Sequence, residues 1–376
     1  MASGTTPTQS LIFGSRLINL MKNPLFNALA LGGAALLLAL PLAQAWNDEG
    51  HRIVTRLALA SLPPEFPAFA RDAANASRVE WLANTPDRWR NVDPWLRQSG
   101  GSWLDHFIDI EYLPRAGIDP RSVPSMRNDF IVMFAAARAA NAEKFDPIDP
   151  AKNAGHTEEW PGFAPWAITE YFEKLRSAFG YLKAYQDFQG SPDEIANARA
   201  DALYAMGIMA HYIGDCAQPL HTTAHFNGWT GANPKGYTKW PGIHSWIDGG
   251  FIGKAKITAE LLRPRTRTAQ PLAVMTRADG RNPMFVVVMD YILAQFEQVE
   301  PLYRLEKDGL LGRGDQPITS EGRAFIEGQL LTGGEMLARV WLTAWLTAAP
   351  DPYLRTALTK KKIAAEAKLA PAGGGE

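Results

Sequence analysis

The chain has 376 residues, 46% of them apolar, and a formal net charge of −1 at pH 7. This length supports one large or two ordinary domains with a real hydrophobic core. The near-neutral charge excludes duplex nucleic-acid binding through a broad basic surface, so a polyanionic substrate would have to be held locally, for example by metal ions. Cys216 is the only cysteine, so no internal disulfide can form.

The N-terminal segment 1–45 has the features of a secretory signal peptide. From Met21, which is an alternative start, a lysine precedes the apolar run "LALGGAALLLALPLA" and an Ala-Gln-Ala sequence ends at Ala45. Glycine and proline interrupt the apolar run, and a membrane-spanning helix needs about 20 apolar residues. We therefore expect cleavage after Ala45, no stable membrane anchor thereafter, and an exported protein that is periplasmic or secreted.

After the signal peptide, apolar residues recur at helical spacing. The pattern predicts helices over "HRIVTRLALASL", "RNDFIVMFAAARAANAEKF" and "AITEYFEKLRSAFGYLKAYQDF", and later over 284–298 and 318–346. No strand-like alternation persists for long. The sequence predicts one all-α domain over 46–350, followed by a charged, then glycine-rich flexible tail over 351–376.

One predicted helix has a particularly clear start. Ser191 can cap it, a proline follows, and Glu194 stands three residues after the serine, which together are typical of a capping box. Continuing the helix from this start places His211 and Asp215 on its core-facing stripe.

Histidine and aspartate side chains recur in pairs at a spacing of four residues. His211 and Asp215 form one pair, His244 and Asp248 another, and His221 follows the first. A single pair could be only a hydrogen bond within a helix, but two pairs and a further histidine favour a metal site. Imidazole and carboxylate together suit zinc.

Two other potential ligands are not expected to bind metal. Cys216 follows Asp215, and successive side chains on a helix diverge, so we expect a small buried residue. His225 stands among glycines and aromatic residues and is interpreted as a loop residue.

The order of these motifs resembles that of the zinc-dependent single-strand-specific nucleases, whose structural relatives are the bacterial zinc phospholipases C. The matching elements are Trp46-x₄-His51, Asp87-x₂-Arg90 within "NTPDRWR", "HFIDIE" from His106, "HYIGDCAQPLH" over 211–221, and His244-x₃-Asp248. They cover residues 46–248.

The resemblance implies a multi-helix domain around a cleft with three zinc ions. The first ion would be bound by Asp87, His106, His211 and Asp215, the second by His221, His244 and Asp248, and the third by His51, Asp215 and the amino group and carbonyl of Trp46. A peptide nitrogen cannot serve as that amine donor, so cleavage after Ala45 would complete the third site.

The resemblance also implies hydrolysis of single-stranded DNA and RNA to 5′-phosphate products, with 3′-nucleotidase activity on nucleotides. Close metal ions lower the pKa of a shared water, which makes Asp87 and Asp215 catalytic as well as structural. Arg90 would offset charge on the phosphoryl oxygens. Phe107 would stack on a base and Asp109 would hydrogen-bond its edge. No protein partner is expected.

Departures from the family pattern leave alternatives open. Segment 112–190 resembles an insertion, and the loop 222–243 lacks the Asn-Leu pair that the nucleases carry before their equivalent of His244. A zinc phospholipase C acting on lipid head groups is one alternative, and a non-catalytic zinc-binding protein is another. The short spacing from Trp46 to His51, the "HFID" sequence and Asp248 in place of glutamate favour the nuclease, and Arg90 argues against mere zinc storage.

Overall fold

The computed structural model describes residues 46–92, 95–96, 103–151 and 153–369. The predicted signal peptide lies outside these residues. Within them every regular element is a helix and none is a strand, so the predicted all-α class is confirmed. The described residues all fall in one compact unit.

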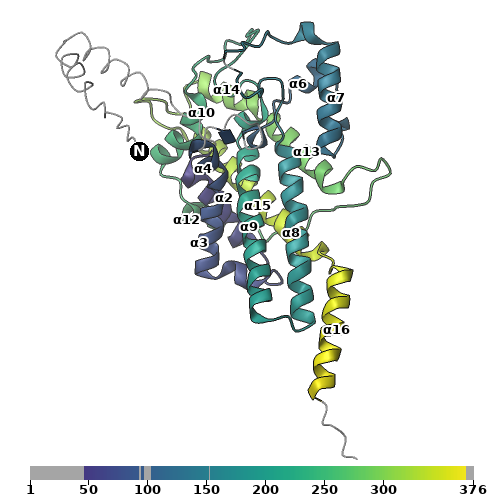
Figure 1. Cartoon of the computed structure of the whole chain (residues 1–376). Coiled ribbons are helices and arrows are strands. Elements are labelled where there is room, and N and C mark those ends of the chain that lie inside the picture. The colour runs from purple at the N-terminus through teal and green to yellow at the C-terminus, as the bar shows by residue number, and fades with distance from the viewer. Residues whose placement is uncertain (1–45, 93–94, 97–102, 152, 370–376) are drawn as a thin grey trace, which may run out of the picture. The chain divides into compact units, whose positions relative to one another are not determined.

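The scaffold is built around two long helices joined by a short turn. Helix α8 (Ala164–Asp187) and helix α9 (Pro192–Ala217) run side by side (Figure 1). Helices α2 (Asp48–Ser61) and α3 (Ala73–Leu82) pack on α9, and α15 (Ser320–Thr347) contacts α2, α8 and α9. Buried apolar residues from all five helices form the core.

Shorter helices surround this scaffold. The α-helices are α4 (Thr85–Val92), α6 (Tyr112–Arg115), α7 (Arg127–Ala140), α10 (Ile243–Ser245), α11 (Phe251–Ala255), α12 (Ala259–Leu262), α13 (Pro283–Phe296), α14 (Val299–Lys307) and α16 (Pro352–Leu369). The 3₁₀ helices are η2 (Ala68–Arg71), η3 (Leu104–His106), η4 (Pro120–Ser122), η5 (Ala142–Lys144), η6 (Pro219–Thr222) and η8 (Arg263–Arg265), and η7 (Trp246–Gly250) is a π-helix.

Helix α9 starts where the sequence predicts. The Ser191 hydroxyl accepts a hydrogen bond from the Glu194 N–H (3.2 Å), and the Glu194 carboxylate accepts one from the Ser191 N–H (2.7 Å). This reciprocal capping box satisfies two backbone donors at the helix start. The last turns of α9 are buried on all sides, which brings His211 and Asp215 into the interior.

Two adjacent glycines let α15 approach the site-bearing helices closely. A Cβ atom at Gly334 would lie 2.7 Å from the Leu57 Cβ of α2, and one at Gly333 would lie 2.8 Å from the Ala217 Cβ of α9. Both distances are shorter than carbon atoms tolerate without a shift. The glycine pair therefore allows α15 to pack closely against the middle of α2 and the end of α9.

Part of segment 112–190 belongs to the scaffold. Helix α8 occupies 164–187 and contacts α9, α13 and α15, with its apolar face fully buried. Sequence spacing alone could not reveal this, because the packing partners lie far away along the chain. Helix α7 precedes it, and Phe130 of α7 stacks on Trp166 of α8 with ring centroids 4.1 Å apart.

The C-terminal segment begins with a helix. Its residues 352–369 form α16, whose alanines, leucines and lysines favour helix. The helix contacts α8 and buries Leu358, and the Tyr181 hydroxyl donates a hydrogen bond to Asp351 (3.0 Å) just before it begins. Across the part of the chain that the structure describes, no helix is both long and apolar enough to span a membrane.

Candidate metal centre

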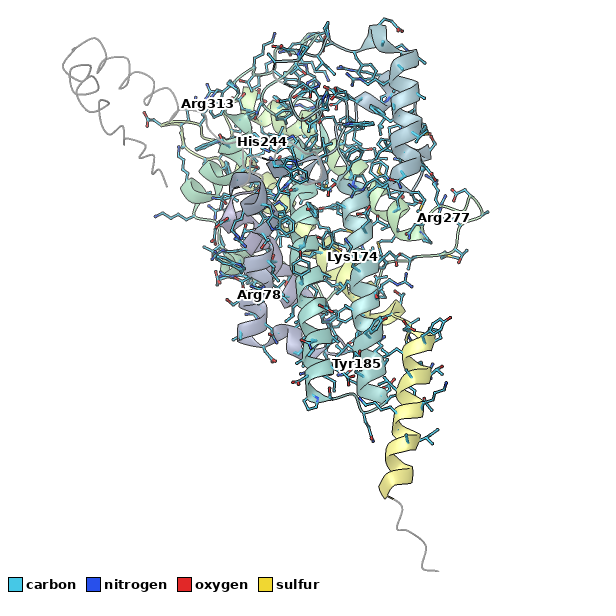
Figure 2. The ribbon with its side chains drawn as sticks, viewed as in Figure 1. Arg78, Lys174, Tyr185, His244, Arg277 and Arg313 are labelled. Carbon is cyan, nitrogen blue, oxygen red and sulfur yellow. The ribbon has the colours of Figure 1, made fainter. Side chains whose placement is uncertain are left out.

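Eight predicted ligands gather at one end of the helical scaffold. They come from the start of α2, α4, η3, the end of α9, η6 and the α10–η7 segment. Figure 2 shows His244 near the end of the scaffold opposite Tyr185, which lies close to the α8–α9 turn. All eight residues are at most 6% exposed: His51, Asp87, His106, His211, Asp215, His221, His244 and Asp248.

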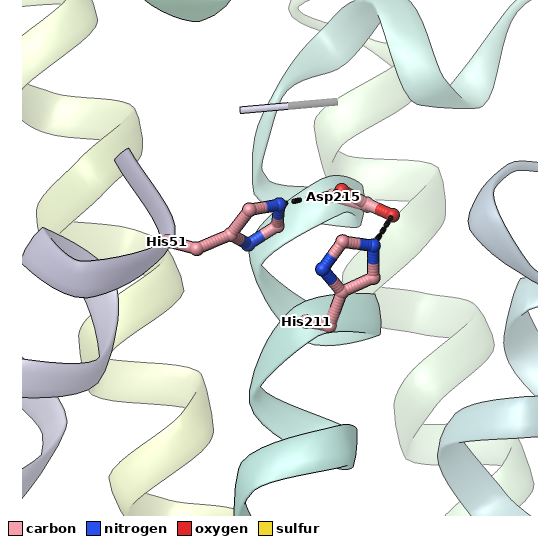
Figure 3. A group of neighbouring side chains, drawn as sticks. All are labelled: His51, His211 and Asp215. Atoms are coloured by element: carbon pink, nitrogen blue, oxygen red, sulfur yellow. Dashed lines mark ion pairs between the residues drawn. The ribbon is translucent and has the colours of Figure 1, made fainter. Parts of the chain in front are cut away.

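The Asp215 carboxylate lies close to histidines that belong to two groups of potential metal ligands. One of its carboxylate oxygens is 3.3 Å from His51 Nε2, and the other is 3.3 Å from His211 Nε2 and 2.9 Å from His106 Nδ1 (Figure 3). The ligand atoms of His51, His211 and Asp215 all lie within 4.8 Å of one another, as do those of Asp87, His106 and His211. The two carboxylate oxygens thus face different histidines, as a bridging ligand requires.

A third group forms from His221, His244 and Asp248, whose ligand atoms also lie within 4.8 Å of one another. His244 Nε2 is 3.0 Å from His221 Nε2 and 3.3 Å from the Asp248 carboxylate. His244 and Asp248 are one turn apart, across the junction of α10 with the π-helix η7. Single π-turns often occur at functional sites.

The donor atoms and their spacing fit metal ions. Ligand atoms of a tetrahedral zinc are roughly 3.3 Å apart, since each lies about 2.0–2.1 Å from the metal. Neighbouring ligand atoms in these groups are 2.9 to 3.9 Å apart. Burying three carboxylates and five imidazoles in this way is costly unless their charges and lone pairs are satisfied. The three buried groups can therefore hold metal ions.

Backbone carbonyls orient two of the histidines. The His211 Nδ1–H donates to the Ala83 carbonyl (2.7 Å), and the His221 Nδ1–H donates to the His106 carbonyl (3.0 Å). With Nδ1 protonated, the neutral ring turns its Nε2 lone pair towards the neighbouring ligands. Metal-binding histidines characteristically have such a partner on the opposite ring nitrogen.

Gln218 is a functional residue that sequence reasoning missed. Its fully buried amide donates to the Asp248 carboxylate (2.9 Å) and accepts from the Leu220 N–H (2.7 Å). These two bonds fix the orientation of Asp248 relative to η6. Its place just before Pro219 between predicted ligands was a usable signal, but the partner Asp248 lies 30 residues away.

The start of α2 is hydrogen-bonded to the segment that carries Asp248. Asn47 caps the helix by accepting from the Gly50 N–H (3.1 Å), and its own N–H donates to the Asp248 carbonyl (3.2 Å). The preceding Trp46 side chain is fully buried. The backbone next to Trp46 is thus held between the segments that carry His51 and Asp248.

Gly214 leaves room for the His51 ring. A Cβ atom at this position would lie 2.8 Å from His51 Nδ1. The His51 ring also stacks on His211, with centroids 4.1 Å apart. A glycine between His211 and Asp215 therefore lets α2 insert a third ligand against α9.

The predicted substrate contacts lie beside this centre along the chain. Phe107 and Asp109 follow the ligand His106, and the intervening Ile108 N–H donates to the His221 carbonyl (3.0 Å). Phe107 is half-buried and meets Trp103 edge-on, whereas Asp109 is buried. Arg90 belongs to α4, but its side chain lies outside the described residues.

The Asp109 carboxyl group is buried, which disfavours its charged form. Burial raises its pKa well above the usual range, and the nearby Glu111 and Glu158 raise it further. A neutral Asp109 can donate a hydrogen bond as well as accept one.

Replacing Asp109 by asparagine is expected to raise the melting temperature near pH 7. A carboxyl whose pKa rises on folding contributes stability that is present below its unfolded pKa of about 3.9 and lost as the pH rises towards the folded value. Asparagine avoids this loss. Melting curves of both proteins followed by circular dichroism over a pH series should diverge from acid to neutral pH. If the difference in melting temperature between the two proteins stayed constant or shrank from acid to neutral pH, the raised pKa of Asp109 would be contradicted.

Cys216 and His225, which the sequence sets apart from the predicted ligands, lie in different surroundings. Cys216 is fully buried, and burial raises the pKa of its thiol, which disfavours the thiolate that would bind a metal. The His225 ring stacks on Trp229 at 3.9 Å. Among the described residues, neither belongs to a group of potential ligands.

The chain matches no family model, and it matches no curated protein.

Proposed function

We propose that the protein is an exported zinc-dependent phosphodiesterase that cleaves single-stranded DNA and RNA to 5′-phosphate products. The observation that carries this proposal is the position of Asp215, whose two oxygens face His51 on one side and His106 and His211 on the other. Two adjacent cations joined by one carboxylate are a common arrangement in enzymes that hydrolyse phosphate esters. Among enzymes that hydrolyse phosphate esters, the order of motifs over 46–248 favours a nuclease.

Zinc is the metal that we propose for these sites, because imidazole nitrogens and carboxylate oxygens are among its usual ligands and imidazoles outnumber carboxylates in the described groups. When bound, such ions lower the pKa of water and offset charge on phosphoryl oxygens. The protein's part is to hold the ligands in place: Ala83 and His106 carbonyls orient two histidines, and Gln218 orients Asp248. Trp46 is proposed to complete one site with its amino group.

Three other side chains would contact the substrate. We assign Arg90 to the phosphoryl oxygens, Phe107 to stacking on a base and Asp109 to the base edge. Phe107 retains partial exposure beside the ligand His106, as stacking requires. Stacking tolerates any unpaired base and contributes about 1–3 kcal/mol for each, which favours single strands without fixing a sequence.

The deciding experiment uses protein that begins at Trp46 and has been loaded with zinc. It is incubated separately with single-stranded DNA, RNA and phosphatidylcholine, each with and without chelator. We expect 5′-mononucleotides to be released only without chelator. Release of phosphocholine from lipid with intact nucleic acid would instead assign the phospholipase C activity. Zinc binding without turnover of any substrate would leave a non-catalytic metal-binding protein.

A further inference from the structure

The loop 222–243 is firmly attached to the structure beside the third ligand group. At its start, the Thr223 hydroxyl and the Ala224 N–H (3.0 Å) both donate to the Glu111 carboxylate. Further along, the Trp229 N–H donates to the Thr238 carbonyl (2.8 Å), which closes the loop on itself. The segment between these anchors has little freedom to move.

Aromatic packing against α14 adds to this rigidity. The His225 ring stacks on Trp229, and Trp229 meets Tyr303 of α14 edge-on at 5.2 Å. The Tyr303 hydroxyl donates to the His225 carbonyl, directly before residue 226. Tyr237 packs on the same rings, 4.7 Å from Trp229 and 5.6 Å from Tyr303.

Phe226 does not join this aromatic cluster. Its side chain remains 36% exposed, while its ring centroid lies 6.1 Å from that of the ligand His244, in an edge-on arrangement. Folding thus leaves a large apolar ring partly in water at the margin of a metal centre, although neighbouring rings of the same loop are packed. A rigidly presented, exposed aromatic ring in this position is suited to receive another flat ring.

We propose that Phe226 is a substrate-contacting residue that stacks on an unpaired nucleobase on the His244 side of the metal centre. This inference rests on the proposed nuclease function and adds a second stacking position to that of Phe107. Two aromatic rings, one following the ligand His106 and one contacting the ligand His244, would hold bases of a strand whose phosphate lies at the metal centre. A duplex could not offer its bases in this way, so the second ring would strengthen selection for single strands.

The test compares steady-state kinetics on a short single-stranded oligonucleotide for the parent protein, Phe226→Ala and Phe226→Tyr. Loss of one stacked base is expected to raise KM by about 5- to 150-fold in Phe226→Ala. The value of kcat should stay within about twofold, because a binding contact shared by ground and transition states changes KM alone. Phe226→Tyr, which keeps the ring, should restore KM.

Tyr353→Ala serves as the matched control, because it removes an 89% exposed aromatic ring from α16, which carries no candidate ligand. An oligonucleotide whose sugars lack bases should bind the parent weakly and show no further loss with Phe226→Ala. If the parent cleaves the oligonucleotide and Phe226→Ala has the parent's KM, the stacking role is wrong and the nuclease function stands. A fall in kcat together with loss of bound zinc in Phe226→Ala would also overturn the stacking role, because it would show that the ring only supports His244. If the parent cleaves no nucleic acid, the proposed function itself fails.

Discussion

Replacing Asp215 by asparagine is expected to reduce the bound metal from three equivalents to about one. The Asp215 carboxylate has oxygens within 3.3 Å of three histidines, namely His51, His106 and His211. Asparagine keeps the shape but removes the negative charge and turns an N–H₂ group towards one neighbouring histidine. The group of His221, His244 and Asp248 does not use Asp215 and should retain its ion.

Metal content after dialysis, measured by inductively coupled plasma mass spectrometry, checks this expectation without any assay of activity. The proposed nuclease activity should fall by more than about 100-fold, because replacing even the outer partners of metal ligands costs 10- to 100-fold. Cys216→Ala is the matched control, since it alters the next residue of the same buried helix and should keep all three ions. Retention of three ions by Asp215→Asn would refute the bridging role.

Local features of the fold were predictable from the sequence because they depend on neighbouring residues. The capping box at Ser191 marks the start of α9 correctly, and its helical spacing places His211 and Asp215 on one face. The sequence also predicts that Cys216 is a buried residue, since adjacent helical side chains diverge. In contrast, the status of α8 as scaffold depends on contacts with α13 and α15, which spacing along the chain cannot reveal.

In the candidate centre, too, local features were predictable from the sequence and long-range contacts were not. Each His–Asp pair four residues apart follows from helical geometry, but bringing Asp87, His106 and His221 to those pairs requires the tertiary fold. Their assignment came from the order of motifs. Gln218 and Gly214 escaped prediction, because the amide acts on Asp248 and the glycine makes room for His51, both remote in sequence. Supporting residues of this kind become visible only when distant segments are seen together.

Removal of the bound metal is expected to lower the melting temperature by about 10 °C or more. A ligand that binds only the native state stabilises it by about 4.1 kcal/mol for each site when its concentration is 1,000 times Kd. In a domain of this size, 1 kcal/mol shifts the melting temperature by about 1.5–2 °C, so two or three occupied sites account for such a shift. Without ions, the three buried carboxylates would lose the cations that offset their charge, which adds to the loss.

The measurement is a thermal melt of protein beginning at Trp46, followed by circular dichroism with and without chelator, with metal removal verified by elemental analysis. Added zinc should restore the original melting temperature, which separates a metal effect from damage by the chelator. In Asp215→Asn the chelator-induced shift should be smaller than in the parent, because fewer ions remain to be removed. A metal-free parent that melts within about 2 °C of the loaded protein would show that the three groups are satisfied without metal, since that shift corresponds to only about 1 kcal/mol.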